Sequence, residues 1–496
     1  MELSFSMINT VLFVVGVIVM ICGWRFFNWV WLKPKKMDKF LREQGLNGNP
    51  YKFLYGDMKE MVQMTADAKL KPINLTDDIV PRIMPFLYNS AKIYGKGKNF
   101  YTWMGPRPFV HVTEPALILQ ILANYSQFQK INGGNPLAKL LARGLVDVEA
   151  DQWAKHRKII NPAFHVEKLK HMVPAFYISC TEMINKWEEL TKEKSSIRKE
   201  EKIFELQKEQ AALVIKAFQS IYIPGSRFLP TKSNRRMKEI DRDVKTTINK
   251  IINKRVTRMK AGESSSDDLL GILLDSNYNE IKQKGNTNFG LSTEEVIEEC
   301  KLFYFAGQET TANLLIWTMI LLGQHTNWQD RARDEALKVF GKRKPDIDGL
   351  NHLKVINMIL LEVLRLYPVG IGLGRMIHEK TTLGNIILPA GSLLQLHMML
   401  LHYDNEMWGD DVKEFKPDRF AEGVSKATKE QASYFPFGGG PRICIGQNFA
   451  MLEAKMALVM ILRSFSFELS PSYIHAPHTI ITLQPQYGAQ LILHKL

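Results

Sequence analysis

A run of 22 consecutive residues without a charge lies near the N-terminus and constrains the topology of the chain more than any other feature. The run falls between Glu2 and Arg25 and reads LSFSMINTVLFVVGVIVMICGW. A helix that spans a bilayer needs about 20 apolar residues. The aromatic stretch FFNWVWL follows, and such residues favour the headgroup interface. The next residues are basic: Lys33, Lys35, Lys36, Lys39 and Arg42. Since this positive flank lies C-terminal to the span, we expect the body of the protein to stay in the cytosol.

The alternative for this segment is a cleaved signal peptide. A signal peptide has a shorter apolar region, a basic stretch before it and a small-residue cleavage site after it. Here the apolar region is long, no basic residue precedes it, and bulky aromatic residues follow it. We therefore predict that residues 1–32 form an uncleaved signal anchor. Pro34 is expected to break the helix and to let the body tilt against the membrane.

The composition predicts a globular body in a reducing environment. Hydrophobic residues make up 45% of the 496 residues and charged residues 23%, as is usual for folded domains. The cysteines, Cys22, Cys180, Cys300 and Cys444, form no CxxC pair, which argues against a disulfide framework and against structural zinc. The net charge of +14 fits a solvated basic surface, contact with anionic lipid or an acidic protein partner. No nucleic-acid motif accompanies the charge, so we expect no nucleic-acid partner.

The body, residues 33–496, is predicted to be one mainly helical domain with small sheets. Two short strands around a turn are expected in each of three places: Phe100–Thr113, Asn385–Met398 and the C-terminal ITLQPQYGAQLIL. Polar loops are expected in three others: Thr191–Lys202, Gly262–Asp268 and Asn279–Gly290. Nearly everything else carries helical periodicity.

One long helix is well marked. Ser292 and Glu295 have the spacing of a capping box, and the apolar pattern continues to about Leu322, with Gly323 as the expected stop. A helix of roughly 30 residues is about 45 Å long. A helix of that length is expected to cross the middle of the domain.

Cys444 lies in FGGGPRICIG, where it is crowded by glycines. A helical stretch begins just after it, at Gln447, so the thiol is expected near a helix N-terminus, where the dipole favours a thiolate. The three glycines from Gly438 to Gly440 permit a sharp turn and the close approach of a flat group. Arg442 could pair with a carboxylate.

For a lone cysteine the plainer interpretation is a buried free thiol, and two reactive alternatives stand beside it. A cysteine nucleophile would need a histidine base, and this stretch contains none. A thiolate beside an arginine and a flat cleft suits haem, with the sulfur on the iron and the guanidinium on a propionate.

The same stretch resembles the haem-binding signature FxxGxRxCxG of the cytochrome P450 monooxygenases. Its five fixed positions are matched by Phe437, Gly440, Arg442, Cys444 and Gly446. The resemblance covers nearly the whole chain after the anchor. It implies that these residues bind haem b, with Cys444 as the axial ligand of the iron. It also implies the P450 fold, which is mainly α, with a long central helix, haem between that helix and the cysteine loop, and small β-sheets.

The stretch AGQETT in the long helix resembles the oxygen-binding motif of the family. Gly307 inside a helix costs about 1 kcal/mol relative to alanine, which favours a group packed against the backbone there. Ala306 and Gly307 would leave room above the iron. The Thr310 hydroxyl can bond to the carbonyl one turn back. The resemblance implies that Thr310 and Glu309 deliver protons to bound dioxygen.

Further matches concern the support of the haem. Glu362 and Arg365 in EVLR share one helix face. Together with Arg419 in KPDRF they resemble the ExxR and PERF elements of the family, which implies a buried structural cluster. Asp418 stands where glutamate is commoner. The resemblance also implies propionate contacts from Trp153 and Arg157 in WAKHR, and from Arg375 in GIGLGR.

The resemblance implies an NADPH- and O2-dependent monooxygenase in the endoplasmic reticulum membrane, with a single span. No flavin or nicotinamide motif appears in the sequence, so the electrons are expected from a flavin-containing reductase. Its docking surface in the family is acidic, which suits the positive net charge here. Lys155 and Lys158 beside the Trp153 helix are the expected contacts.

Two stretches resemble a plant clan that includes secologanin synthase and triterpenoid oxidases: LREQGLNGNPYKFLYGD and SYFPFGGGPRICIGQNFAMLEAKMAL. This implies a hydrophobic terpenoid substrate, either a triterpene acid or an iridoid. The expected pocket residues are Ala306, Thr310 and Gly370–Leu373.

One segment departs from the clan: Trp187–Phe204 is shorter than expected. Two alternatives to the monooxygenase stay open. One is a haem-thiolate isomerase or dehydratase, which would need no reductase; Thr310 and Glu309 argue against it. The other is a haem protein made inactive by the shortened segment.

Overall fold

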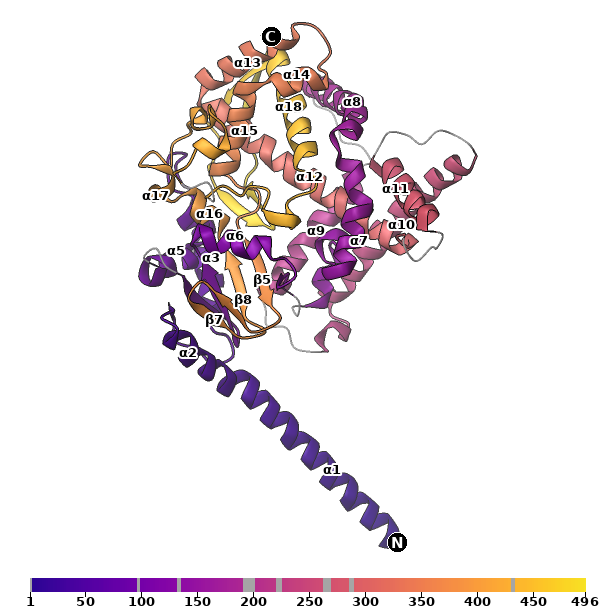
Figure 1. Ribbon diagram of the computed structural model, residues 1–496, viewed down its shortest axis with the longest axis vertical. Helices are drawn as coiled ribbons and strands as arrows, with labels where there is room; N and C mark the ends of the chain where they lie inside the picture. Colours follow the sequence, from indigo (N-terminus) through magenta and orange to yellow (C-terminus); the bar gives the residue numbers. More distant parts are fainter. Residues whose placement is uncertain are drawn as a thin grey trace.

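The computed structural model describes residues 2–95, 99–131, 135–190, 201–219, 225–261, 269–284, 290–429 and 433–496. Figure 1 shows a helical body from which α1 (Glu2–Phe27) projects as a single long helix. Within the described ranges, the helical stretch Ile8–Glu43 is the one candidate for a membrane span by length and apolar composition. The N-terminal run that the sequence marks as apolar is therefore a helix outside the body, and the side chains of residues 8–24 are exposed apart from that of Val17, which is half-buried.

The prediction that Pro34 breaks this helix is wrong. A π-helical turn, η1 (Asn28–Leu32), joins α1 to α2 (Lys33–Glu43), and Pro34 lies in the first turn of α2. Proline has no N–H and crowds the carbonyl four residues back, which here belongs to Val30. The wider π turn accommodates this, because the Lys33 amide donates to Asn28 O. The Tyr51 hydroxyl of the body donates to Val30 O at 2.6 Å, so the freed carbonyl is satisfied.

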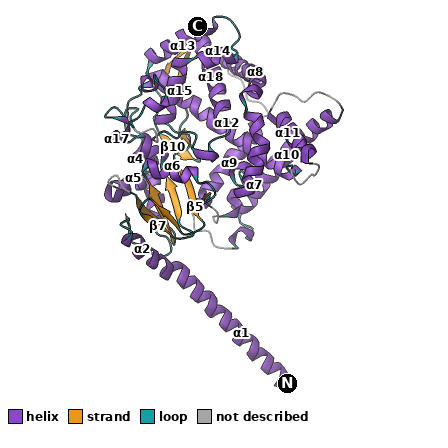
Figure 2. Cartoon of the chain, in the orientation of Figure 1, coloured by secondary structure: helices purple, strands orange, loops and turns teal. Residues whose placement is uncertain are grey.

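Helices make up most of the body, as predicted (Figure 2). The longer ones are α3 (Met58–Lys69), α6 (Pro115–Ala123), α7 (Ala150–Ile160), α8 (Val166–Leu190), α9 (Glu201–Phe218), α10 (Lys232–Lys260), α11 (Leu269–Lys284), α12 (Thr293–Gln324), α13 (Thr326–Phe340), α15 (Lys354–Leu366) and α18 (Gln447–Ser464). The short ones are α4 (Val80–Ile83), α5 (Pro85–Ser90), α14 (Ile347–His352), α16 (Met398–His402) and α17 (Asn405–Trp408).

Helix α12 crosses the body (Figure 1) and begins with the predicted capping box. The Ser292 side chain accepts from the Glu295 amide, and the Glu295 carboxylate accepts from the Ser292 amide. Gly323 does not stop the helix, which continues to Gln324. A Cβ at Gly323 would lie 3.3 Å from the backbone nitrogen of Leu469, so this glycine instead allows close packing against β9 (Phe465–Leu469). The largest hydrophobic cluster surrounds α12 and includes α13, α15 and α18.

The main sheet has six strands in the order β1-β2-β3-β8-β5-β4, and it lies on the side of the body from which α1 leaves (Figure 1). Its strands are β1 (Asn47–Gly48), β2 (Phe100–Met104), β3 (Arg107–Val112), β4 (Phe128–Gln129), β5 (Leu373–Ile377) and β8 (Leu393–Leu396). The predicted hairpin at Phe100–Thr113 is confirmed, with Tyr101 opposite Val110 in β2 and β3.

The other two predicted hairpins are wrong, although their strands exist. β7 (Ile386–Leu388) pairs with β6 (Thr381–Leu383), whereas β8 pairs with β3 and β5. Near the C-terminus, β11 (Thr482–Pro485) pairs with β10 (Pro477–Ile480), and β12 (Leu491–Lys495) pairs with β9. Each turn signal marks a strand end, but the neighbouring strand belongs to a different pair.

The predicted polar loops are only partly described. Residues 279–284 belong to α11 and residues 201–202 to α9, so these ends of the expected loops are helical. Residues 191–200, 262–268 and 285–289 lie outside the described residues. Most of the segment that the sequence marks as shortened therefore lies outside them too.

Candidate functional site

The loop before α18 holds Cys444 in a tight turn. The Cys444 amide donates to Phe437 O at 2.9 Å, which closes the loop on itself. Gly438 and Gly440 have φ of +73° and +65°, a region that glycine occupies without strain. A Cβ at Gly440 would lie 2.1 Å from the carbonyl oxygen of Leu122 in α6. The sequence predicts that these glycines allow the close approach of a flat group. At Gly440 the group that lies close is the backbone of helix α6.

The Cys444 thiol is accessible although it lies deep among protein atoms. Burial raises its pKa, while a backbone hydrogen bond from Gly446 and the charge of Arg157 act in the opposite direction. The hydrogen bond from Gly446, at the start of α18, is the stabilising influence expected of a helix N-terminus, but burial outweighs it. The Cys444 sulfur can be reached by another molecule but is poorly solvated. Its thiolate form therefore needs a bound cation to stabilise the negative charge.

The middle of α12 is the second part of the site. The helix is buried near both ends, yet residues 303–310 are only partly buried or exposed. The Thr310 hydroxyl donates to Ala306 O at 2.6 Å, as predicted, and α12 stays α-helical through this turn. A Cβ at Gly307 would meet no atom within 4 Å. Among the described residues, no atom lies within 4 Å of that position, so the space beside Gly307 is open to another molecule.

Aromatic rings place this turn of α12 near the cysteine loop. The ring of Phe164 lies 5.4 Å from that of Phe303 in α12 and 6.3 Å from that of Phe449 in α18. A Cβ at Gly446 would lie 3.8 Å from Phe164 and 4.0 Å from the Cys444 sulfur. The segment Gly370–Leu373 borders the same loop, because Leu373 lies 3.7 Å from the Cβ position of Gly438. A Cβ at Gly370 would meet open space.

Arginines converge on the loop from three elements. Arg157 of α7 donates to Ile443 O at 2.9 Å, and both terminal nitrogens of Arg442 donate to Val148 O at 3.2 Å. Arg442 also pairs with Glu149, and its guanidinium lies 4.6 Å from the centre of the Trp153 ring. Burial lowers the pKa of Arg157, of Arg442 and of Arg375 in β5, and Arg442 lowers that of Arg375 further.

Lys130 belongs to this cluster, and sequence reasoning missed it. Its ammonium group donates to the carbonyls of Leu145 and Val146. Burial first, and then the charges of Arg442 and Arg375, lower the pKa of Lys130 to about 7. It follows β4, whose pairing with β5 brings it near Arg375. Lys130 belongs to no sequence motif. Its place in the cluster could have been predicted only from the pairing of β4 with β5.

The cluster has the chemistry of an anion site. Lys130, Arg375 and Arg442 are poorly solvated, Lys130 and Arg375 are repelled by their neighbours in the cluster, and Glu149 is an acidic neighbour of all three. Arg157 is desolvated as well. An added anion would offset this desolvation, and guanidinium groups suit carboxylates well. The residues therefore fit the two propionates of haem, with Cys444 and the open side of Gly307 available to its iron and its face.

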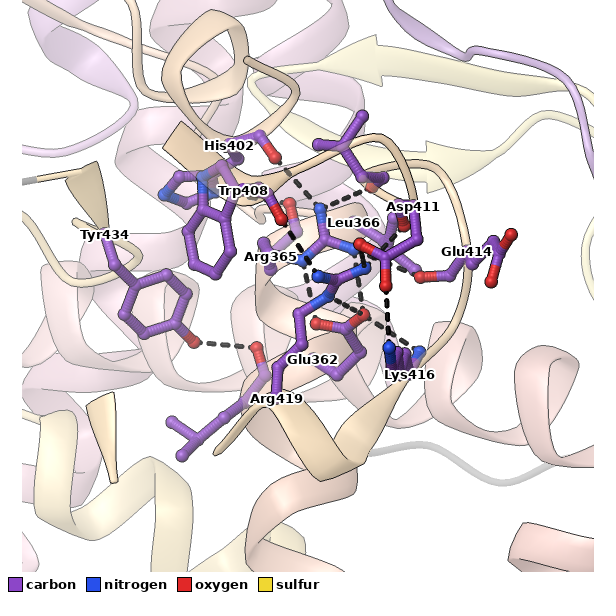
Figure 3. A network of polar contacts seen from close by, with 12 residues as sticks. Glu362, Arg365, Leu366, His402, Trp408, Asp411, Glu414, Lys416, Arg419 and Tyr434 are labelled. Atoms are coloured by element: carbon purple, nitrogen blue, oxygen red, sulfur yellow. Dashed lines mark hydrogen bonds and ion pairs between the residues drawn. The ribbon is translucent and has the colours of Figure 1, made fainter. Parts of the chain in front are cut away.

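The predicted support cluster is present (Figure 3). Arg365 makes a bidentate ion pair with Glu362, at 2.7 and 2.8 Å, and both side chains are fully buried. Its remaining N–H groups donate to the carbonyls of His402, Val412 and Glu414. Arg419 joins from the other side, with Nε 3.4 Å from Glu362. Asp418 points elsewhere and pairs with Arg331 at 3.3 Å.

A second contact that sequence reasoning missed concerns Glu309. Its Oε1 accepts from the Thr482 hydroxyl at 2.8 Å and lies 3.3 Å from the Asn313 amide nitrogen. Thr482 begins β11, 173 residues along the chain. Glu309 is thus fixed by a strand near the C-terminus.

Comparison with known proteins agrees with this arrangement. The family description cytochrome P450 matches residues 83–206 and 195–492. The chain belongs to the cytochrome P450 family and is a haem-thiolate monooxygenase. Among its relatives, cytochrome P450 CYP72A219 of Panax ginseng is 60% identical, and the 7-deoxyloganic acid hydroxylase of Catharanthus roseus is 51% identical; each alignment covers 100% of both chains. Cytochrome P450 72A397 of Kalopanax septemlobus is 54% identical over 96% of this chain and 95% of its own.

Proposed function

We propose that this protein hydroxylates a hydrophobic plant terpenoid, with electrons from NADPH that reach it through a flavin-containing reductase. The observation that carries the proposal is the Cys444 thiol, accessible and close to an arginine cluster and to the open turn of α12. The name of the Catharanthus roseus relative, a 7-deoxyloganic acid hydroxylase, supports an iridoid or a related terpenoid acid as the substrate.

The proposed roles follow from the contacts. Cys444 would hold the haem iron, and Arg157, Arg375, Arg442 and Lys130 would hold the propionates, whose charge offsets the repulsion among Lys130, Arg375 and Arg442. Trp153 keeps the Arg442 guanidinium in place through its ring. Haem with a thiolate ligand supplies dioxygen activation when it is bound. Phe437, Gly440 and Gly446 shape the loop that presents the sulfur.

The polypeptide handles protons and water. Thr310 keeps its hydroxyl on Ala306 O, beside the open space at Gly307, where it can hold a water molecule. Glu309, one residue earlier, can supply the proton. Ala306 and Gly370–Leu373 border the space for the substrate. The domain for this chemistry is residues 33–496, and residues 1–32 anchor it in the endoplasmic reticulum membrane facing the cytosol, in line with the exposed apolar helix α1.

Two experiments test the proposal. The first is the carbon monoxide difference spectrum of the reduced protein, in which Cys444→Ser should abolish the red-shifted band. An unchanged band would refute the ligand assignment. The second is a terpenoid panel, 7-deoxyloganic acid included, incubated with membranes, NADPH and reductase. A hydroxylated product that requires the reductase supports the proposal, whereas conversion without reductase would indicate an isomerase or dehydratase.

A further inference from the structure

The hairpin β10–β11 contacts Glu309 and Asn313 in the middle of α12 through the side chain of Thr482. Thr482 and Asn313 are both nearly fully buried. The Asn313 amide nitrogen contacts Glu309 O at 2.9 Å and Thr482 Oγ1 at 3.1 Å, and the Thr482 hydroxyl donates to Glu309 Oε1 at 2.8 Å. The three side chains close a triangle in which the hydroxyl accepts from the amide and donates to the carboxylate.

This triangle occupies one oxygen of Glu309 and leaves the other. Both side-chain contacts reach Oε1, and among the described residues no hydrogen bond reaches Oε2. A glutamate side chain turns about three bonds, so a free one would sample many directions. With Oε1 held by a buried donor, the direction of Oε2 is fixed, and it is the oxygen left to exchange a proton with water.

The hairpin that supplies Thr482 is itself firmly placed. The Leu483 amide donates to Val369 O at 3.1 Å, and the Trp317 indole N–H donates to Leu483 O at 3.1 Å. Val369 directly precedes the pocket segment Gly370–Leu373. At the tip, Ile481 has φ of +66°, a conformation that β-branched residues rarely adopt and that the surroundings must hold. Strand β11 therefore joins the pocket segment to α12, and Thr482 is its polar contact with Glu309.

We propose that Thr482 and Asn313 are positioning residues for proton delivery. They fix the orientation of the Glu309 carboxylate, and through β11 they couple this orientation to the position of the pocket segment Gly370–Leu373. The proposal rests on the proposed role of Glu309. It predicts that a substrate that displaces the hairpin also turns the carboxylate. The proton would then no longer be delivered to bound dioxygen in the productive position. NADPH oxidation would yield hydrogen peroxide instead of hydroxylated product.

The first test needs neither substrate nor reductase. Thr482→Val keeps the shape of the side chain and removes the hydroxyl, while Thr482→Ser keeps the hydroxyl. Hydrogen–deuterium exchange of residues 477–485 in the haem-loaded full-length protein should become at least about tenfold faster in Thr482→Val, because this variant loses both the hydrogen bond to Glu309 and the one from Asn313. Glu309→Leu should also accelerate this exchange, because it removes the acceptor of the Thr482 hydroxyl, and Thr482→Ser should remain close to wild type.

The matched control is Thr318→Val. Thr318 is a buried threonine of α12, and within the described part of the chain its hydroxyl donates to Leu314 O alone, at 2.7 Å. This variant should leave exchange in the hairpin unchanged. Exchange at wild-type rate in Thr482→Val, or equal acceleration by Thr318→Val, would overturn the proposal.

The second test measures coupling, as product formed per NADPH oxidised, with 7-deoxyloganic acid as the first probe and otherwise the compound that the terpenoid panel identifies. Thr482→Val should lower this ratio several-fold while the carbon monoxide spectrum stays that of the wild type. Adding Thr482→Val to Glu309→Gln should cause no further loss, because the threonine acts through the carboxylate. If Glu309→Gln itself leaves the ratio unchanged, the proposed function of Glu309 fails. If Glu309→Gln lowers the ratio and Thr482→Val does not, the positioning role alone fails.

Discussion

At the scale of single residues, Lys130 tests the arginine cluster most directly. Burial lowers the pKa of Lys130 to about 7, so its charged form is disfavoured there until an anion arrives. Lys130→Met should lower haem retention on dilution roughly tenfold, the effect of losing one charge-assisted hydrogen bond. Lys130→Arg should retain haem. The measurement is haem per polypeptide after gel filtration; equal retention in both variants would remove Lys130 from the site.

Glu453 in α18 gives a residue-scale prediction about pH. Burial raises the pKa of Glu453 to about 7, whereas an unfolded chain gives a glutamate near 4.3. Between these values the native state keeps a proton that the unfolded state has lost, so stability falls as pH rises from about 4.5 to 7. Glu453→Gln imitates the protonated form. It should nearly match wild type at low pH, below about 4.3, where both states of the wild-type protein are protonated, and exceed its stability by about 1–3 kcal/mol at pH 8. Thermal denaturation of the detergent-solubilised protein at the two pH values checks this, and an equal offset at both would contradict it.

Residues within one motif could be predicted from the sequence, because a fixed spacing brings their side chains together. Cys444 with its glycines, the pair Glu362 and Arg365, and the back-bonded hydroxyl of Thr310 all depend on neighbours a few positions away. Lys130 and Thr482 could not be predicted in this way. Their contacts come from chain pairings over hundreds of residues, and neither residue type is unusual where it stands.

At the scale of elements, a buried ion pair fastens α7 to α12. His156 Nδ1 lies 2.5 Å from Glu299 Oε1, with both side chains buried, and a Cβ at Gly144 would lie 2.7 Å from the Glu299 carboxylate. His156→Leu would leave this carboxylate buried and unpaired, so stability should fall by about 3–5 kcal/mol. The double replacement His156→Leu with Glu299→Leu should recover much of the loss, because an apolar pair can fill the same volume. Thermal denaturation of the three proteins separates these outcomes; no recovery in the double variant would mean that packing, not charge, dominates.

The same pair predicts that the contact between α7 and α12 becomes less stable at alkaline pH. Burial alone would lower the pKa of His156, but the hydrogen bonds and charges of Glu299 and Glu295 outweigh it and raise the pKa above 6.5. The stabilisation is complete below pH 6.5 and is lost as pH rises through the native pKa. Hydrogen exchange of α7 should therefore accelerate at alkaline pH in wild type. In the double leucine variant this pH dependence should disappear.

Elements with strong local signals could be predicted well, and their partners could not. The capping box of α12 and the hairpin β2–β3 depend on neighbours along the chain, and both are present. The turns after β7 and β11 are also real, yet the following strands pair elsewhere, β8 with β3 and β5 and β12 with β9. A turn residue fixes where a strand ends. Which strand lies beside it is decided by the burial of distant apolar faces.

At the scale of the whole molecule, the junction between α1 and the body decides how the anchor is held. Pro34 takes away the intrahelical partner of Val30 O, and the Tyr51 hydroxyl replaces it. The ring of Trp31 lies 6.3 Å from Tyr51 and 5.9 Å from Phe53. Helix α1 is therefore joined to the body by a buried hydrogen bond and by aromatic contacts, not by a free linker. A tilt of the body would have to break the hydrogen bond.

This contact predicts a rescue. Tyr51→Phe leaves Val30 O buried without a donor, which costs about 1–3 kcal/mol, so amide exchange over residues 28–43 in lipid nanodiscs should accelerate. Pro34→Ala supplies a new N–H four residues after Val30, and in the double variant this amide can take over the carbonyl. The double variant should therefore exchange as slowly as wild type, because Val30 O is then satisfied within the helix and not by a residue of the body. If Tyr51→Phe alone leaves the exchange unchanged, the aromatic contacts suffice to hold the anchor. If the double variant stays fast, the π turn does not depend on the proline.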